Sequence, residues 1–251
     1  MALLGLVFPL VSAAGCNQNA GSGSEVASAS AEVATSGGEE PTAGGVASTG
    51  TPRRVEIVTD LGRMVVELSD ATPQHRDNFV KLVEEGFYDG LLFHRVIQGF
   101  MVQGGDPQSR GAAPGARLGA GGPGYTIPAE IRPDLFHTKG ALSAARQGDN
   151  VNPERASSGS QFYIVQGRPT PEADLRNTEA RLRMSGGDFI YPPAAVEAYG
   201  KLGGTPHLDQ QYTVFGYVVE GLEIIDAIAA AKTAPGDRPV EDIRMTLKML
   251  N

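Results

Sequence analysis

The run 93–106 places Arg95 and Gln103 among mainly apolar residues. Arg95 and Gln103 are expected on two adjacent stretches of extended chain, with Phe100 and Met101 between them. Long polar side chains within apolar strands need hydrogen-bonding partners, so they favour a binding pocket over simple core packing. The run offers no nucleophile. These residues therefore predict a pocket that binds and polarises an amide without cleaving it.

Four further segments continue the pattern along the chain. They are 141–146 (ALSAAR), 158–164 (SGSQFYI), 207–209 (HLD) and 212–216 (YTVFG). Together with 93–106, and in the same order, they resemble the cyclophilins, the peptidyl-prolyl cis-trans isomerase family. The resemblance covers roughly residues 53–251. It implies isomerase activity and a closed eight-stranded antiparallel barrel capped by two helices, with the binding groove on the outer wall.

Arg95 and Gln103 are the expected catalytic residues. Rotation about a peptide bond has a barrier of ~18–20 kcal/mol, because the nitrogen donates its lone pair into the carbonyl. In the twisted transition state that nitrogen becomes pyramidal, so a fixed donor aimed at it binds the twisted form best. The planar guanidinium of Arg95 can act as this donor. Gln103 can hold a substrate carbonyl or fix the arginine.

The other expected site residues bind the substrate around a cavity for the proline ring. They are His94, Phe100, Met101, Ala145, Arg146, Gln161, Tyr163, His207, Leu208 and Tyr212. Each apolar member, taken alone, fits the barrel core equally well. Compared with the best-known eukaryotic cyclophilins, Tyr163 replaces a phenylalanine, His207 a tryptophan and Tyr212 a histidine. That tryptophan contacts cyclosporin in the family, so the resemblance implies weak binding of that drug.

The secondary-structure pattern is mainly one of strands. Segments 55–59 and 64–68 alternate and predict a hairpin with its turn at 60–63, followed by a helix that Thr72 and Pro73 begin and Gly86 ends. Further strands are predicted at 92–97, 100–103, 161–166, 213–219 and 241–250, and a second helix at 221–231. Antiparallel strands without a βαβ rhythm indicate an all-β barrel or sandwich, and periodicity alone leaves both open.

Residues 168–204 have no counterpart in a minimal cyclophilin, so they form an expected insertion. A helix is predicted from about 170 to 186 and a shorter one from 193 to 201. Three roles are compatible with this insertion: a lid, a partner-binding face or a decorated loop. The glycine-rich run 119–124 matches a dinucleotide fingerprint only as a string, because the residues after it read as extended chain. The sequence Ser158-Gly159-Ser160 likewise lacks the context of a nucleophile elbow.

The first 52 residues are typical of a targeting signal followed by a flexible tether. Residues 2–14 are apolar and too short to span a bilayer, as in a signal peptide, and Ala13-Ala14-Gly15-Cys16 resembles a bacterial lipobox. We expect a signal peptide at 1–15, a lipidated Cys16 and disordered tether at 16–52, and the isomerase domain at 53–251. Asn17 favours the outer membrane, facing the periplasm. A plain cleaved secretory signal is the alternative.

Composition limits the other partners. The net charge is -8, and without a Lys/Arg cluster the sequence predicts no nucleic-acid binding. One cysteine and four scattered histidines predict no metal site and no disulfide within the chain, and the resemblance implies no cofactor. The expected partners are proline-containing peptides and unfolded exported proteins, bound by a monomer. A non-catalytic module for proline peptides and a chaperone are the alternative functions.

Overall fold

The computed structural model describes residues 52–184 and 186–250. Its strands are β1 (Arg54–Thr59), β2 (Gly62–Leu68), β3 (Leu91–Leu92), β4 (Arg95–Ile97), β5 (Met101–Gly104), β6 (Thr126–Ile127), β7 (Ala141–Ala144), β8 (Ser157–Ser158), β9 (Phe162–Val165), β10 (Val214–Glu220) and β11 (Arg244–Leu250). Its helices are α1 (Pro73–Glu84), α2 (Glu172–Met184), α3 (Pro193–Lys201) and α4 (Leu222–Ala229), with 3-10 turns η1 (Pro107–Ser109) and η2 (Pro206–Leu208).

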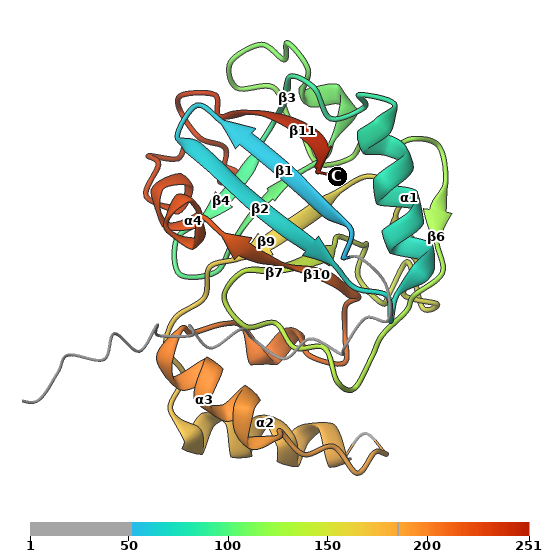
Figure 1. Ribbon diagram of the computed structural model, residues 1–251, viewed down its shortest axis with the longest axis vertical. Coiled ribbons are helices and arrows are strands. Elements are labelled where there is room, and N and C mark those ends of the chain that lie inside the picture. The colour runs from blue at the N-terminus through green and yellow to red at the C-terminus, as the bar shows by residue number, and fades with distance from the viewer. Residues whose placement is uncertain (1–51, 185, 251) are drawn as a thin grey trace, which may run out of the picture. The chain divides into compact units, whose positions relative to one another are not determined.

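The main sheet is antiparallel and strongly curled (Figure 1). Its strand order is β3-β11-β1-β2-β10-β7-β9-β5-β4, and β6 and β8 form a separate pair. The predicted hairpin is confirmed as β1 and β2, which turn at Asp60-Leu61. Gly62 begins β2 with a φ of +137°, a conformation that suits glycine.

The predicted closed eight-stranded barrel is wrong, because the sheet is an open, curled arrangement of nine strands. The end strands β3 and β4 belong to one stretch of chain, 91–97, and do not pair with each other. Residues 93 and 94, which separate these two strands, belong to neither of them. Phe93 donates to the carbonyl of Ile243 at 2.9 Å, and Val96 donates to that of Asp237 at 2.8 Å. Both acceptors lie in the segment between α4 and β11, so the chain at 93–96 bonds to that segment and β3 does not pair with β4.

The core lies on the concave face of the curled sheet, between α1 and α4. Alternating residues of β1 and β2, such as Val55, Ile57 and Met64, are fully buried there. Phe79 of α1 and Ile225 of α4 belong to the same cluster. The two predicted helices therefore both bury their apolar faces in the core, because period 2 in the strands and period 3.6 in the helices bring these side chains to one side.

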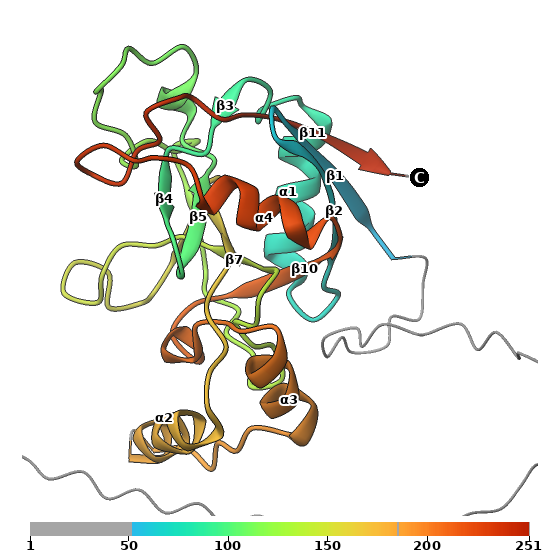
Figure 2. The ribbon, with the colours of Figure 1, turned by 90° about the vertical axis from the view of Figure 1, so that its left-hand side faces the viewer.

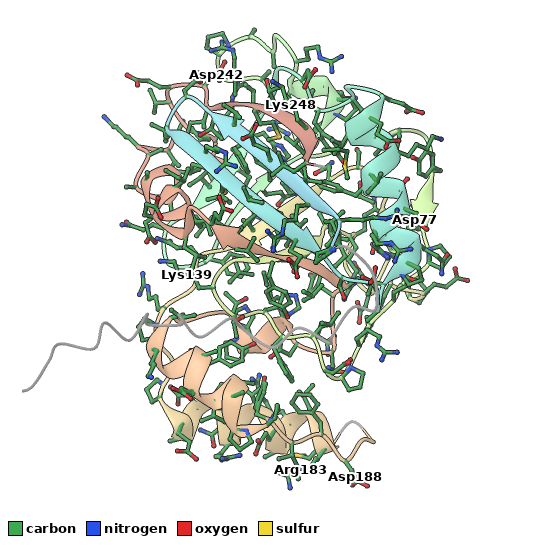
Figure 3. All side chains as sticks on the ribbon, in the orientation of Figure 1. Asp77, Lys139, Arg183, Asp188, Asp242 and Lys248 are labelled. Carbon is green, nitrogen blue, oxygen red and sulfur yellow. The ribbon has the colours of Figure 1, made fainter. Side chains whose placement is uncertain are left out.

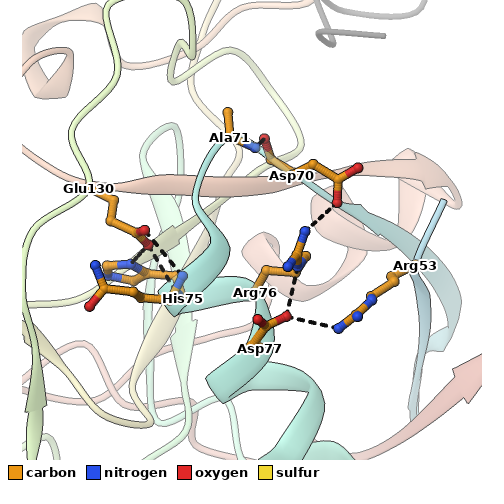
Figure 4. A network of polar contacts seen from close by, with 9 residues as sticks. Arg53, Asp70, Ala71, His75, Arg76, Asp77 and Glu130 are labelled. Carbon is orange, nitrogen blue, oxygen red and sulfur yellow. Dashed lines mark hydrogen bonds and ion pairs between the residues drawn. The ribbon is translucent and has the colours of Figure 1, made fainter. Parts of the chain in front are cut away.

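The N-terminus of α1 is capped differently from the prediction. The helix begins at Pro73 as expected, but the side chain of Thr72 makes no capping bond. Glu130 takes its place: it accepts from the backbone of Gln74 at 3.1 Å and of His75 at 2.9 Å (Figure 4). It also contacts Nδ1 of His75 at 2.6 Å. A carboxylate at this end of a helix also complements the helix dipole.

The insertion 168–204 carries both predicted helices, α2 and α3. Figures 1 and 2 show them packed together beyond β7 and β10, at one end of the domain. They have their own apolar cluster, which consists of Phe136, Leu175, Tyr191, Ala195 and Tyr199. Figure 3 places Arg183 and Asp188 at the outer end of the insertion. The insertion is therefore a small helical layer rather than a decorated loop.

The glycine-rich run 119–124 is a loop followed by β6, so the residues after it are extended chain, as predicted. Among the described residues, no helix has the length and apolar character required to cross a membrane. The predicted signal peptide at 1–15, Cys16 and the tether at 16–52 lie outside the described residues, except for Pro52 at the end of the tether.

Candidate active site

The strand register brings three of the predicted site residues into one row. Arg95 of β4 lies opposite Gln103 of β5, and Gln103 lies opposite Tyr163 of β9. Since residues two apart in a strand share a face, Met101 lies on the same face as Gln103. Val102, between them, points into the core instead. The alternation of β5 thus separates a core face from a site face.

A pocket of about 160 Å³ opens on the site face. It is lined by Arg95, Phe100, Met101, Gln103, Ala145, Arg146, Tyr163, Leu208 and Tyr212. Every one of these residues was predicted from the sequence, although they come from separate parts of the chain. Drug-sized ligands occupy pockets of roughly 300–1,000 Å³, so this one suits a single small ring or side chain.

Arg95 is held by one ion pair in the described part of the chain. Its Nε donates to Oδ2 of Asp237 at 3.3 Å. The two side chains are 43% and 44% exposed, so the pair is screened by solvent and orients the guanidinium more than it stabilises the fold. The contact uses Nε, and the terminal nitrogens of Arg95 remain available to donate into the pocket.

Gln103 is fixed by the neighbouring Gln161. Its Nε2 donates to Oε1 of Gln161 at 3.0 Å, and Nε2 of Gln161 donates to the carbonyls of Gly119 and Gly121 at 3.0 and 2.7 Å. Buried Asp106 fixes the same loop, because it accepts from the backbone of Gly119. Gln161 does not line the pocket, so its role is to support Gln103, which does.

Arg146 lines the pocket in a different way from Arg95. Its side chain is only 4% exposed, and it donates to the carbonyl of Gln211 at 3.0 Å and to Asp149 at 2.6 Å. Its guanidinium carbon lies 4.4 Å from the centre of the Tyr212 ring, which is a cation-π distance. Arg146 is therefore committed to the pocket wall, whereas Arg95 is available for a ligand.

Tyr163 forms the floor of the pocket. Its ring is 5% exposed, and its hydroxyl lies 3.0 Å from Nε2 of the buried His137. Burial raises the pKa of Tyr163 well above its ordinary value, so the hydroxyl stays protonated. The hydroxyl that distinguishes Tyr163 from a phenylalanine thus has His137 as its hydrogen-bonding partner, behind the pocket.

Besides Gln161, two more predicted site residues, His207 and His94, lie beside the pocket rather than in its lining. The ring of His207 stacks on that of Phe100, with centroids 5.7 Å apart. His94 is 3% exposed and lines an adjoining cavity of about 620 Å³ that also includes Arg95 and Gln103. Neither ring nitrogen of His94 makes a well-formed hydrogen bond to the described residues. Burial, opposed by the charge of Asp106, lowers the pKa of His94.

Sequence reasoning did not find Asp237 or His137 as parts of the site. Asp237 reaches Arg95 from the loop between α4 and β11, and 142 positions separate them. Its left-handed φ of +62° marks a tight turn, but nothing in the local sequence indicates an ion pair. His137 was interpreted only as a scattered histidine. In the described residues, no three His, Cys, Asp or Glu side chains form a group that could hold a metal ion.

Comparison with known proteins gives a consistent result. The family model described as cyclophilin type peptidyl-prolyl cis-trans isomerase/CLD matches residues 54–248. A protein of Staphylococcus epidermidis named as a peptidyl-prolyl cis-trans isomerase is 41% identical over 191 residues, which cover 76% of this chain and 87% of the relative. A Staphylococcus aureus protein with the same name is 38% identical over the same length and the same shares of the two chains.

Solved structures show the same fold. A cyclophilin type peptidyl-prolyl cis-trans isomerase of Cryptosporidium parvum matches with a TM-score of 0.56 and 24% identity, over 80% of this chain and 99% of the other. A second crystal structure of that protein, in the presence of the dipeptide Ala-Pro, matches with a TM-score of 0.55 and 23% identity, over 79% and 99% of the two chains.

Proposed function

The chain belongs to the cyclophilin-type peptidyl-prolyl cis-trans isomerases, and we propose that it catalyses rotation about X-Pro bonds in exported proteins with Arg95 as the transition-state donor. The observation that carries this mechanism is the row Arg95, Gln103 and Tyr163 across three paired strands. The row places a charged donor, a neutral amide and an apolar floor around a pocket for one small ring.

The X-Pro amide would bind with its proline ring in the pocket, against Phe100, Met101 and Leu208. The related fold that was crystallised in the presence of Ala-Pro supports a proline-containing ligand. The ring is then fixed while the preceding residue turns. As the imide nitrogen becomes pyramidal it regains a lone pair, which a terminal nitrogen of Arg95 can address.

Gln103 would hold the carbonyl side of the substrate or the arginine in this arrangement. Because Gln161 accepts from one of its amide hydrogens, the Gln103 amide is oriented before the substrate arrives. A preoriented donor or acceptor costs no reorganisation at the transition state, so it favours the twisted form over both planar forms.

A non-catalytic module for proline peptides would need the apolar pocket but not Arg95 beside it. The measurement that separates the two functions is cis/trans exchange of an Ala-Pro test peptide, followed by NMR with the wild-type protein. We expect exchange to be accelerated. A folded protein that binds the peptide but leaves its exchange rate unchanged would refute catalysis.

We further propose that the protein acts outside the cytoplasm, attached to a membrane by lipid on Cys16, with the outer membrane as the favoured site. The support is the apolar run 2–14 and the small residues before Cys16. Labelling of cells with a lipid precursor tests this. The wild type should be labelled and a Cys16→Ser variant should not, whereas an unlabelled wild type would leave only a cleaved secretory signal.

The weak binding of cyclosporin also remains a proposal. His207 stands at the groove edge in place of the family's tryptophan, and it stacks on Phe100. An imidazole offers less apolar contact area than an indole. A His207→Trp variant should therefore bind the drug more tightly than the wild type in a titration, and equal affinities would contradict the assignment.

A further inference from the structure

The carboxylate of Asp209 lies buried between the insertion and the rest of the domain, with its side chain 0% exposed. Its Oδ1 accepts from the backbone N–H of His137 at 2.8 Å and contacts Nδ1 of the same residue at 2.8 Å. Its Oδ2 accepts from the hydroxyls of Tyr191 at 2.7 Å and Tyr199 at 2.6 Å. A buried charge needs several donors, and the insertion supplies two of these four.

The two hydroxyls of the insertion act as donors. Burial, followed by the charge of Asp209, raises the pKa of both Tyr191 and Tyr199, so each keeps its proton. The tyrosines are 2% and 0% exposed, and their rings pack edge to face with centroids 5.6 Å apart. They are therefore fixed donors with no access to water.

From Asp209 the hydrogen bonds continue to the pocket. A carboxylate only accepts, so Nδ1 of His137 must donate to Asp209. Nε2 of the same ring is hydrogen-bonded to the hydroxyl of Tyr163, 3.0 Å away. The His137 and Tyr163 rings are also nearly parallel, with an angle of 13° between them. The position of the pocket floor thus depends on the ring that Asp209 orients.

Asp209 also holds a second wall of the pocket. It directly follows Leu208, which lines the pocket, and His207, which stacks on Phe100. His207 and Leu208 belong to the short turn η2, which Asp209 directly follows. Leu208 donates to Thr205, Asp209 to Pro206 and Gln211 to Leu208, and the hydroxyl of Tyr191 also lies 3.4 Å from the carbonyl of Pro206. The buried side chain of Asp209 therefore joins the end of this turn to the insertion.

The helices of the insertion are themselves tied to this anchor. Glu179 of α2 is 1% exposed and accepts from the backbone N–H of Tyr191 at 2.8 Å. At the exit of the insertion, Gly204 packs so closely that a Cβ there would lie 2.4 Å from the carbonyl of His137 and 2.5 Å from the Tyr199 ring. The insertion is thus in close contact with the segment behind the pocket at Gly204 and His137.

We propose that the insertion 168–204 is a support of the proline pocket: Tyr191 and Tyr199 hold Asp209, which positions Tyr163 through His137 and Leu208 through η2. The four residues Tyr191, Tyr199, Asp209 and His137 are positioning residues, because none of them lines the pocket. They set the affinity for the proline side chain, while Arg95 sets the rate of rotation. This inference rests on the proposed proline pocket.

The test is a Tyr191→Phe/Tyr199→Phe double variant, which removes two donors from Asp209 and preserves both rings. NMR titration with the Ala-Pro test peptide gives the Kd, and line-shape analysis gives the exchange rate on the enzyme. We expect the Kd to rise by about 3- to 30-fold, the size of typical coupling effects, with the rate on the enzyme little changed. The ¹⁵N signals of the His137 ring should shift as well.

Tyr88→Phe is the matched control. Tyr88 is 1% exposed in the main core, and its hydroxyl donates to the carbonyl of Ser160 at 3.2 Å, outside the Asp209 network. This variant should lose stability and keep the wild-type Kd. If the double variant does not fold, the two single variants are measured instead, since each of them leaves three donors on Asp209.

A folded insertion variant with the wild-type Kd, or one that loses only rate, would overturn the proposal, as would an equal rise in Kd for Tyr88→Phe. Failure of the proposed function looks different, because the wild type itself would then fail to bind the peptide or to accelerate its exchange.

Discussion

Replacing Arg95 by alanine should almost abolish catalysis while leaving the fold nearly unchanged. The guanidinium is the charged group of the pocket that is not already committed to the wall, since Arg146 is buried and bonded to Gln211 and Asp149. Removal of a preoriented donor from a developing charge typically lowers a rate by about 10²–10³. At 1.36 kcal/mol per tenfold change, this corresponds to roughly 2.7–4 kcal/mol of transition-state stabilisation.

The expected cost in stability is much smaller. The Arg95 and Asp237 side chains are 43% and 44% exposed, and their single contact is 3.3 Å long. An exposed ion pair of this kind contributes about 0.2–1 kcal/mol. For a domain of this size, 1 kcal/mol shifts the Tm by roughly 2–4 °C. The Arg95→Ala variant should therefore melt within a few degrees of the wild type.

The assay is cis/trans exchange of an Ala-Pro test peptide, measured by NMR for wild type and variant beside their melting curves. Arg132→Ala is the matched control, because Arg132 pairs with Asp134 at 3.2 Å with exposed fractions of 47% and 40%, away from the pocket. The control should retain full activity. The reasoning would be refuted by an Arg95→Ala protein that keeps more than a tenth of the wild-type rate, or by an equal loss in Arg132→Ala.

Three further predictions follow from the surroundings of the site. Gln161→Ala removes the partner of Gln103 and the link to Gly119 and Gly121, so kcat/KM should fall about tenfold, as expected for a net loss near 1.4 kcal/mol, and unchanged kinetics would contradict this support. Asp237→Asn should lower the rate only a few-fold and change the stability by less than about 0.5 kcal/mol, which urea unfolding and the exchange assay can check. Burial lowers the pKa of His94 below its ordinary value of 6.5, so the unfolded chain binds a proton more readily and stability should fall as the pH drops below that value, by at most about 1.4 kcal/mol per pH unit. A His94→Gln variant should have a shallower dependence between pH 7 and 5, and an identical dependence would show that His94 does not contribute.

The strands and helices could be predicted because their patterns are local. The hairpin of β1 and β2, the start of α1 at Pro73 and both helices of the insertion lie where the periodicity and the Gly and Pro residues indicate them. The lining of the pocket could be predicted because the resemblance to a known family indicated which residues form it. Periodicity alone does not show that residues as distant as Phe100 and Leu208 lie together. Capping of α1 by Glu130 could not be predicted, since its bonds to residues 74 and 75 span 56 and 55 positions.

The sequence by itself determined which side chains are available for chemistry. Arg95, Gln103 and the apolar residues after them have the types that a pocket for a twisted amide requires, and the alternation of β5 decides that Met101 and Gln103 share a face. Only the tertiary structure decided what holds these groups in place. The partners of Arg95, Tyr163 and Gln103 are Asp237, His137 and Gln161, at separations of 142, 26 and 58 residues. Likewise, the open end of the sheet and the role of Asp209 depend on where distant segments meet. Local propensity acts over a few residues, whereas burial and hydrogen bonding of a side chain depend on whichever segment the fold brings beside it.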